Sequence, residues 1–167
     1  MAEHTVQQAR TLSCTIEVWY AGGSEELMQN WLGTDLCYRE QPVGDLGDRM
    51  CAAFRSAFNQ GYQRVMLVGT DCPGLTTALL AQGFAELQNQ VVTIGPAIDG
   101  GYYLIGLQWL VPELFKGISW STDTVLPETL QIADRLNLDL VLLPCLRDID
   151  LPEDLKYLAP SFDVNLS

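Results

Sequence analysis

Acidic side chains follow three segments of the chain, where they could bind a metal ion or a phosphate-bearing ligand. Asp71 lies directly after the apolar run Val65–Val68, Asp99 precedes two glycines, and Asp148 lies near the C-terminus. Mg²⁺ prefers one or two carboxylates together with phosphate oxygens and water. Three acidic turns on one sheet indicate a metal-assisted transferase that acts on a phosphate-bearing donor.

Asp71 is the first candidate for a metal ligand. The run Val65–Val68 is typical of a strand buried on both faces, and open α/β sheets bind ligands at the carboxyl ends of such strands. Thr70 would line the same turn. The structural alternative is that Asp71 forms an Asx turn or caps the helix predicted over residues 76–89.

Asp99 is the candidate catalytic residue, in the sequence Asp-Gly-Gly-Tyr-Tyr. Gly100 and Gly101 permit a close approach of the backbone to a ligand, although a tight turn into the next strand would also require them. Tyr102 and Tyr103 point to opposite faces of that strand, so one of them faces the cleft, and we predict a binding role for Tyr102. Asp99 could act as a general base or as an electrostatic stabiliser of the donor or acceptor.

A second polar segment, Gly44-Asp45-Leu46-Gly47-Asp48-Arg49, opens a predicted helix. Backbone N–H groups at a helix start suit an anion, which makes Gly44 and Asp45 candidates for nucleotide binding. Arg49 could pair with a phosphate. The alternative is a polar loop with a surface ion pair.

The segment Trp120-Ser121-Thr122 is a further candidate, because it offers a stacking face and a hydroxyl group to a sugar. Ser121 is the predicted binding residue. In the structural alternative, Trp120 is a core anchor, and Ser121 or Thr122 caps the helix predicted over residues 124–136.

Composition excludes several classes of function. Nine basic residues against 21 acidic ones give a net charge of −12, which argues against binding to nucleic acid or to an anionic membrane. No apolar run is long enough to cross a bilayer and the N-terminus lacks the apolar core of a signal peptide, so we predict a cytoplasmic protein. A divalent cation would offset the repulsion between this acidic chain and a phosphate.

Cysteine and histidine usage limits the chemistry further. The five cysteines are odd in number and include no C-x-x-C pair, so a disulfide framework or a zinc site is not expected. His4 is the only histidine and lies in the first predicted helix. Triads and metal sites based on histidine are therefore excluded.

The hydrophobic pattern alternates between helical and strand periodicity, which predicts a three-layer, mostly parallel α/β sheet in one domain over residues 1–167. Helices are predicted over 2–12, Ser24–Leu32, 47–60, 76–89, 124–136 and 152–158, and strands over Thr15–Ala21, Val65–Thr70, Val91–Gly95, Tyr102–Leu107 and Leu138–Leu143.

Five motifs in this order and spacing resemble one bacterial family. They are QPVGDLGDRM (41–50), VGTDCPGLT (68–76), GPAIDGGYYLIGL (95–107), LFKGISWST (114–122) and LRDIDLPEDL (146–155). Together they resemble the radical-SAM/selenodomain-associated, or arsenosugar-biosynthesis, glycosyltransferases, which are nucleotide-diphospho-sugar transferase-like. The resemblance covers essentially the whole chain and implies a Rossmann-like fold of the glycosyltransferase A type, akin to sugar-phosphate nucleotidyltransferases.

The chain departs from this family at its start. Family members begin several tens of residues earlier, with a first strand and a loop rich in Gly, Pro, Lys and Arg that contacts the nucleotide, whereas Met1 falls at the family's first helix. We therefore expect a sheet that lacks its first strand. The two strands beside the gap could pair directly, or a partner chain could cover the exposed edge, which would give a homodimer.

The resemblance also implies roles for the acidic residues. Asp150 reads as the cap of the helix over 152–158, whereas Asp148 has no such role and would be the second metal ligand by similarity to nucleotidyltransferases. Asp71 and Asp148 would hold Mg²⁺ or Mn²⁺ against the diphosphate of a nucleotide-sugar donor, and Asp99 would face a small-molecule acceptor. The prediction is a metal-dependent glycosyltransferase. The alternatives are a nucleotidyltransferase that acts on a sugar-phosphate-like acceptor, and a truncated, non-catalytic binding protein.

Overall fold

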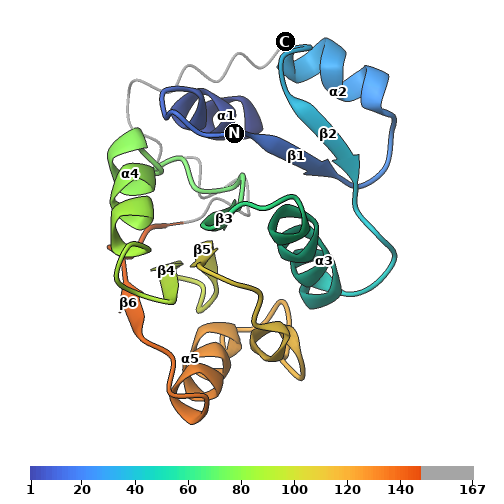
Figure 1. Cartoon of the computed structure of the whole chain (residues 1–167). Coiled ribbons are helices and arrows are strands. Elements are labelled where there is room, and N and C mark those ends of the chain that lie inside the picture. The colour runs from blue at the N-terminus through green and yellow to red at the C-terminus, as the bar shows by residue number, and fades with distance from the viewer. Residues whose placement is uncertain (148–167) are drawn as a thin grey trace.

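The computed structural model describes residues 1–147 (Figure 1). Asp148, Asp150 and the helix predicted over 152–158 lie outside the described residues. Within the described part, no helix is both long and apolar enough to cross a membrane. The elements are α1 (Ala2–Arg10), β1 (Glu17–Tyr20), α2 (Glu25–Leu32), β2 (Cys37–Glu40), α3 (Leu46–Asn59), β3 (Val65–Val68), α4 (Thr77–Glu86), β4 (Val92–Pro96), β5 (Tyr102–Leu107), a 3₁₀ turn η1 (Pro112–Phe115), α5 (Val125–Arg135) and β6 (Leu140–Leu142).

The strands form two sheets rather than one. The first holds β1 and β2, which are parallel, and the second has the order β3-β5-β4-β6. In the second sheet β5 runs antiparallel to both β3 and β4, while β6 runs parallel to β4. It follows that β3, β4 and β6 share one direction, so their carboxyl ends lie at the same edge. The predicted α/β class is confirmed.

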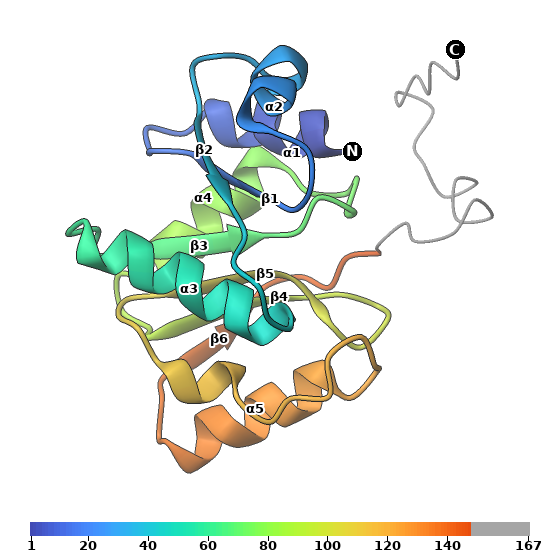
Figure 2. The ribbon, with the colours of Figure 1, turned by 90° about the vertical axis from the view of Figure 1, so that its right-hand side faces the viewer.

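Helices cover both faces of the four-stranded sheet (Figure 2). On one face, Phe54 of α3 and Ile132 of α5 belong to the same buried cluster as Ile94 and Ile105 of the sheet. On the other face, Leu80 of α4 packs in a second cluster with Tyr103 and with Leu104, and Ala9 of α1 borders it. The predicted three layers are therefore present, and burial of apolar surface on both faces is the main force that holds them together.

Local sequence signals place the helix starts. Side-chain oxygens of Ser24, Asp45 and Thr76 accept hydrogen bonds from the backbone N–H three residues later, at 3.3, 2.8 and 3.3 Å. These bonds satisfy N–H groups that have no partner inside the helix. Ser24 and Thr76 are the first residues of two of the helices that the sequence predicts. Pro127 lies in the first turn of α5, where its missing N–H costs little.

Two expectations about strands are wrong. No strand is predicted at β2, whose sequence Cys-Tyr-Arg-Glu has one buried side chain, Tyr38, and lacks an apolar run. The predicted direct pairing across the gap is also absent among the described residues, because β1 pairs with β2 and β3 pairs with β5, and neither pairs with the other. The two sheets of the described residues therefore have no hydrogen-bonded ladder between them.

Tyr103 offers a test of the packing between β5 and the chain that follows β6. Its hydroxyl donates to the carbonyl oxygen of Pro144 at 3.1 Å, and burial raises the pKa of Tyr103 to about 12. A raised pKa stabilises the fold below the unfolded value of about 10, and this contribution is lost as the pH rises through the folded value. Tyr103→Phe should lower the free energy of unfolding by about 1 kcal/mol at pH 7.

The difference in unfolding free energy between wild type and Tyr103→Phe should then shrink between pH 10 and 12. In this range the unfolded wild type loses the phenol proton that the folded wild type keeps, and the variant has no such proton. Urea unfolding at a series of pH values measures it. The matched control is Tyr62→Phe, at an exposed tyrosine. A constant difference across that pH range would contradict the prediction.

Candidate functional site

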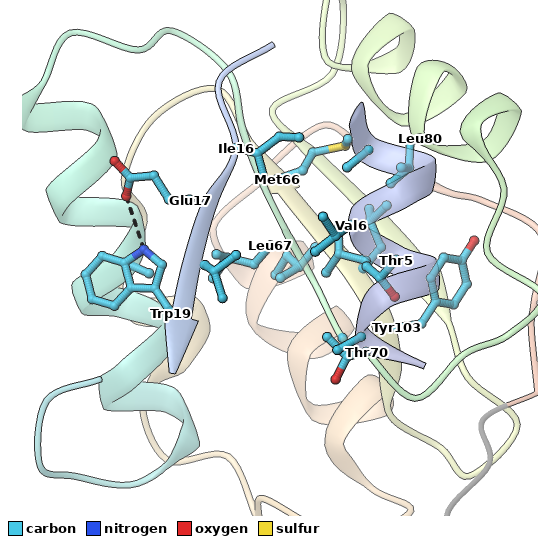
Figure 3. Close-up of a pocket in the computed structure, with 18 of the residues that line it drawn as sticks. Thr5, Val6, Ile16, Glu17, Trp19, Met66, Leu67, Thr70, Leu80 and Tyr103 are labelled. Atoms are coloured by element: carbon cyan, nitrogen blue, oxygen red, sulfur yellow. Dashed lines mark hydrogen bonds between the residues drawn. The ribbon is translucent and has the colours of Figure 1, made fainter. Parts of the chain in front are cut away.

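A cavity of about 520 Å³ lies between the two sheets (Figure 3). Its long walls are the segments 14–19, which contains most of β1, and 66–71, which contains most of β3. Helix α1 borders it through Thr5 and Val6, and α3 through Ala53. Most of the lining is apolar, and its polar groups include Gln41, Arg49, Thr70 and Asp71, which follow strands β2 and β3.

The turn after β3 carries the predicted metal ligand. The backbone N–H of Gly69 donates to the carbonyl oxygen of Tyr103 at 2.8 Å, which ties the end of β3 to β5. A Cβ atom on Gly69 would lie 2.8 Å from Asp71 Oδ1, so the carboxylate folds back over this residue. Thr70 and Asp71 both line the cavity. Glycine at position 69 is thus what allows the carboxylate to take this place.

Arg49 reaches the same cavity from the first turn of α3. Its Nε donates to the carbonyl oxygen of Gly44 at 3.1 Å, and its Nη1 donates to Gln41 Oε1 at 3.3 Å. Gln41 is itself held between backbone groups: its N–H donates to Tyr20 at 2.8 Å and its side chain to Trp19 at 3.0 Å. The guanidinium group is therefore fixed at the cavity by the loop that follows β2, which is itself bonded to the end of β1. It retains further N–H groups that could meet a phosphate.

Gly44 and Asp45 lie beside Arg49 but do not line the cavity within the described residues. The side chain of Asp45 caps α3, so a carboxylate already occupies this helix start. A nucleotide-binding role for these two residues stays a prediction.

Asp99, Gly100 and Gly101 form the turn between β4 and β5, and none of them lines the cavity in the part of the chain described. Asp99 Oδ1 accepts a hydrogen bond from the Gly101 N–H at 2.8 Å, which is the tight-turn geometry expected of the structural alternative. Gly100 has φ of 91°, and its carbonyl oxygen accepts from Leu126 N–H at 2.8 Å. The glycine thus permits close packing of the turn against the start of α5.

Tyr102 and Tyr103 point to opposite faces, as predicted, since Tyr102 packs on the cluster under α3 and α5 and Tyr103 on the one under α4. Both contribute to the cavity wall. Burial raises the pKa of Tyr102 strongly, so this phenol stays neutral at any physiological pH.

Ser121 lies in the loop before α5, at a positive φ of 63°, away from the cavity lining in residues 1–147. Its neighbour Trp120 packs edge-on against Tyr102, with ring centroids 6.5 Å apart. This contact fits the alternative in which Trp120 anchors the core. The predicted cap is wrong: the cap position of α5 is Thr124, and the helix begins at Val125, two residues later than a cap at Thr122 would require and three later than one at Ser121.

A metal ion would have few protein ligands here. Within the described residues, no group of three or more His, Cys, Asp and Glu side chains could hold one. Asp148 lies outside that part, although Leu146, two residues before it, is hydrogen-bonded to Ile98 beside Asp99. The donor set of Asp71 and Thr70 suits Mg²⁺, which keeps several waters and takes phosphate oxygens from its substrate. It does not suit a zinc site.

Four of the binding residues predicted from the sequence line this one cavity: Arg49, Thr70, Asp71 and Tyr102. Gln41 lines it too and is not among the predicted residues. Gln41 follows β2, and the polar sequence of this strand gives no signal for it. Gln41 is nevertheless the first residue of the motif 41–50, which also contains Arg49. Membership of this motif is the one signal in the sequence that could have pointed to Gln41.

Solved structures define the class of fold. The chain matches a protein from Desulfovibrio desulfuricans G20, named as a proposed nucleotide-diphospho-sugar transferase, at 35% identity and a TM-score of 0.84. The match covers 89% of this chain and 66% of that one, so the chain spans slightly under two thirds of its relative's length. A second match is CMP:2-keto-3-deoxy-manno-octonic acid synthetase in complex with CTP. It has 12% identity and a TM-score of 0.58, covers 93% and 84% of the two chains, and shows the fold alone.

The family is settled by sequence. A family profile matches residues 5–122, and the chain belongs to DUF2064, the uncharacterized proteins conserved in bacteria. No curated protein matches it. The expected kinship with nucleotide-diphospho-sugar transferases is confirmed at the level of fold and structural relative, and the link to radical-SAM or arsenosugar chemistry stays a prediction.

Gly69→Ala tests how the carboxylate is placed. The added methyl group would meet Asp71 Oδ1, the end of an exposed side chain, and make that side chain rotate away, at a cost of about 0.5–1.5 kcal/mol in unfolding free energy. Thermal unfolding measures the loss. The control is Gly74→Ala, where the methyl group would lie at an ordinary 3.4 Å from Leu146. Equal stability of the two variants would contradict this account of the turn.

Proposed function

We propose that this protein binds a nucleotide-diphospho-sugar together with Mg²⁺ or Mn²⁺ and transfers the sugar to a small acceptor. The observation that carries the proposal is that Arg49, from the first turn of α3, and Thr70 and Asp71, from the turn after β3, line one cavity. The solved relative at 35% identity supports the choice of donor.

Charge favours a metal-assisted reaction over one that relies on basic residues. The whole chain has nine Lys and Arg residues, and two of these, Arg10 and Arg39, form ion pairs with Asp35 and Glu17. Arg49 already donates to Gly44 and Gln41, so it can offset only part of the charge of a diphosphate. A divalent ion held by Asp71, with Asp148 as the proposed second ligand, would neutralise the leaving diphosphate.

In this reaction the bond between the anomeric carbon and the diphosphate breaks, and a bond from that carbon to the acceptor oxygen forms. Thr70 and Arg49 orient the diphosphate at the end of β3. Asp99 is the proposed acceptor-side group, because the turn that carries it follows β4, whose carboxyl end lies at the same edge of the sheet as that of β3. It could accept the proton that the acceptor hydroxyl loses.

A nucleotidyltransferase is the second candidate, since the fold is shared with the synthetase that was solved with CTP. The two reactions differ in the bond that breaks. Incubation with a nucleotide sugar and a mixture of small acceptors should release a nucleoside diphosphate if the sugar is transferred, whereas nucleoside triphosphate with a sugar phosphate should release pyrophosphate in the second case.

Asp71→Asn provides the sharpest test of the donor site. Calorimetric titration of the wild type with nucleotide sugars should show binding that requires Mg²⁺ or Mn²⁺, and the variant should lose the metal requirement and at least about tenfold in affinity, because a neutral amide is a poor ligand for a hard cation. Asp134→Asn, at an exposed position of α5, is the matched control.

Arg49→Met should weaken donor binding with and without metal, while Arg55→Met, on the exposed part of the same helix, should not. Donor binding by the wild type that is indifferent to metal, and unchanged in Asp71→Asn, would refute the proposed metal site. A chain that binds no nucleotide under any condition would favour the non-catalytic alternative.

A further inference from the structure

The loop between η1 and α5 lies against the turn that carries Asp99 (Figure 2). A Cβ atom on Gly100 would lie 2.6 Å from the Cα atom of Asp123, and the Leu126 N–H donates to the Gly100 carbonyl oxygen at 2.8 Å. Because neighbouring Cα atoms are about 3.8 Å apart, the Cα atoms of Asp99 and Asp123 lie within about 8 Å of each other. The two carboxylates therefore belong to one part of the edge at which β4 ends.

The same loop also contacts the wall of the cavity. Trp120 packs on Tyr102, which lines the cavity, with ring centroids 6.5 Å apart. A Cβ atom on Gly47, in the first turn of α3, would lie 2.6 Å from Nε1 of Trp120. Residues 120–123 therefore connect the cavity with the turn of Asp99. A compound that reacts with a donor in the cavity while it contacts Asp99 must lie beside this loop.

Hydrogen bonds inside the loop fix its backbone. The Thr122 hydroxyl donates to the Ser119 carbonyl oxygen at 2.6 Å, and the Thr124 hydroxyl donates to Glu128 Oε1 at 2.9 Å. Glu128 Oε2 accepts from the Ser119 N–H at 2.7 Å. Both sides of the loop are thus tied to α5, so its conformation is set before any ligand binds.

Two polar side chains of this fixed loop take no part in these bonds. Ser121 and Asp123 are exposed, and neither side chain has a hydrogen bond or an ion pair with residues 1–147. Ser121 has φ of 63°, a left-handed conformation that is costly for a residue with a side chain and that is concentrated at ligand sites. Asp99, by contrast, already accepts from the Gly101 N–H through Oδ1. Asp123 therefore offers two carboxylate oxygens where Asp99 offers one.

Charge decides which kind of compound fits beside these residues. Two neighbouring carboxylates, in a chain of net charge −12, repel a phosphate or a carboxylate. Apart from Lys116, residues 91–134 contain no Lys or Arg. Arg147 follows Leu146, which is hydrogen-bonded to Ile98 of the same turn, and a phosphorylated compound would need such a cation. A neutral compound with hydroxyl groups needs none, because carboxylate oxygens accept hydrogen bonds from hydroxyls.

We propose that Asp123 and Ser121 bind the acceptor of the transfer reaction, and that this acceptor is a neutral compound with neighbouring hydroxyl groups, either a polyol or a sugar without phosphate. Asp123 accepts hydrogen bonds from two neighbouring hydroxyls, and Ser121 bonds to a third. Oδ2 of Asp99 is left to take the proton of the hydroxyl that reacts. The role of the bound compound as acceptor rests on the proposed function, whereas its binding at the loop does not.

Paired probes test the chemical class of the compound. Glycerol, ribose and glucose, and the phosphate monoester of each, are titrated into the 167-residue chain labelled with ¹⁵N, and the backbone amide shifts are followed. At least one neutral probe should give saturable shifts at Gly100, Gly101 and residues 121–124, and its phosphate ester should bind at least about tenfold more weakly. Lack of a saturable shift with every neutral probe would overturn the proposal, and so would a phosphate ester that binds as tightly as its neutral counterpart.

Variants of the loop test the two residues. Asp123→Asn should weaken binding of the neutral probe by about tenfold or more, whereas Asp134→Asn, at an exposed position of α5, should leave it unchanged. Ser121→Gly should raise the melting temperature, since glycine adopts a positive φ without strain, and yet it should lower affinity for the probe. A purely structural role for Ser121 would not separate these two effects. Equal binding by Asp123→Asn and the wild type would overturn the assignment.

Donor titrations keep this inference apart from the proposed function. Asp123→Asn should bind nucleotide sugars and metal as the wild type does, because Asp123 does not line the cavity within the described residues. Binding of a neutral probe at the loop without any binding of a nucleotide would refute the donor and leave the loop site standing. Donor binding by a chain whose loop responds to none of the neutral probes would refute the loop site alone.

Discussion

The fold depends on how the small sheet is attached to the large one, since no hydrogen-bonded ladder joins them within residues 1–147. Two helices supply the attachment: α1 bonds to α4 through Gln8 and Thr77, and α3 bonds to β1 through Gln60 and Glu17. Burial alone would raise the pKa of Glu17, but hydrogen bonds from Arg39, Gln60 and Trp19 lower it, so the carboxylate stays ionised where it joins these elements. The cavity and the candidate donor site exist because this attachment runs around the gap and not across it.

The sequence predicts the helices better than the sheets, for a physical reason. Helix starts are local: Ser24 and Thr76 bond to N–H groups three residues away, so the signal lies within one turn. Strand pairing is not local, and β2 has neither an apolar run nor alternation, since only Tyr38 of its four residues is buried. The separation of the two sheets could not be predicted from periodicity, because β1 and β3 each look like ordinary buried strands.

The same distinction applies to the site. Asp71 follows an unmistakable strand, so its place at the end of β3 is predictable, and Arg49 lies in a helix start that the sequence marks with Asp45. Asp99 and Ser121 were selected by residue type, and packing decides their surroundings: Asp99 bonds to its own turn, and Trp120 sets the loop of Ser121 by its contact with Tyr102. Residue type alone does not show which polar side chains form hydrogen bonds within their own turn.

Strand β3 and the turn that follows it connect the apolar part of the cavity with the candidate donor site. Residues 66–68 form one edge of the apolar cavity, and the next three residues carry the backbone turn, the hydroxyl and the carboxylate of the candidate donor site. Gly69 is bonded to Tyr103, which fixes one side of this turn, while the other side faces the cavity. The position of Asp71 therefore depends on the support that β5 gives to the end of β3, because a metal ligand must be held in place before it can discriminate one ion geometry from another.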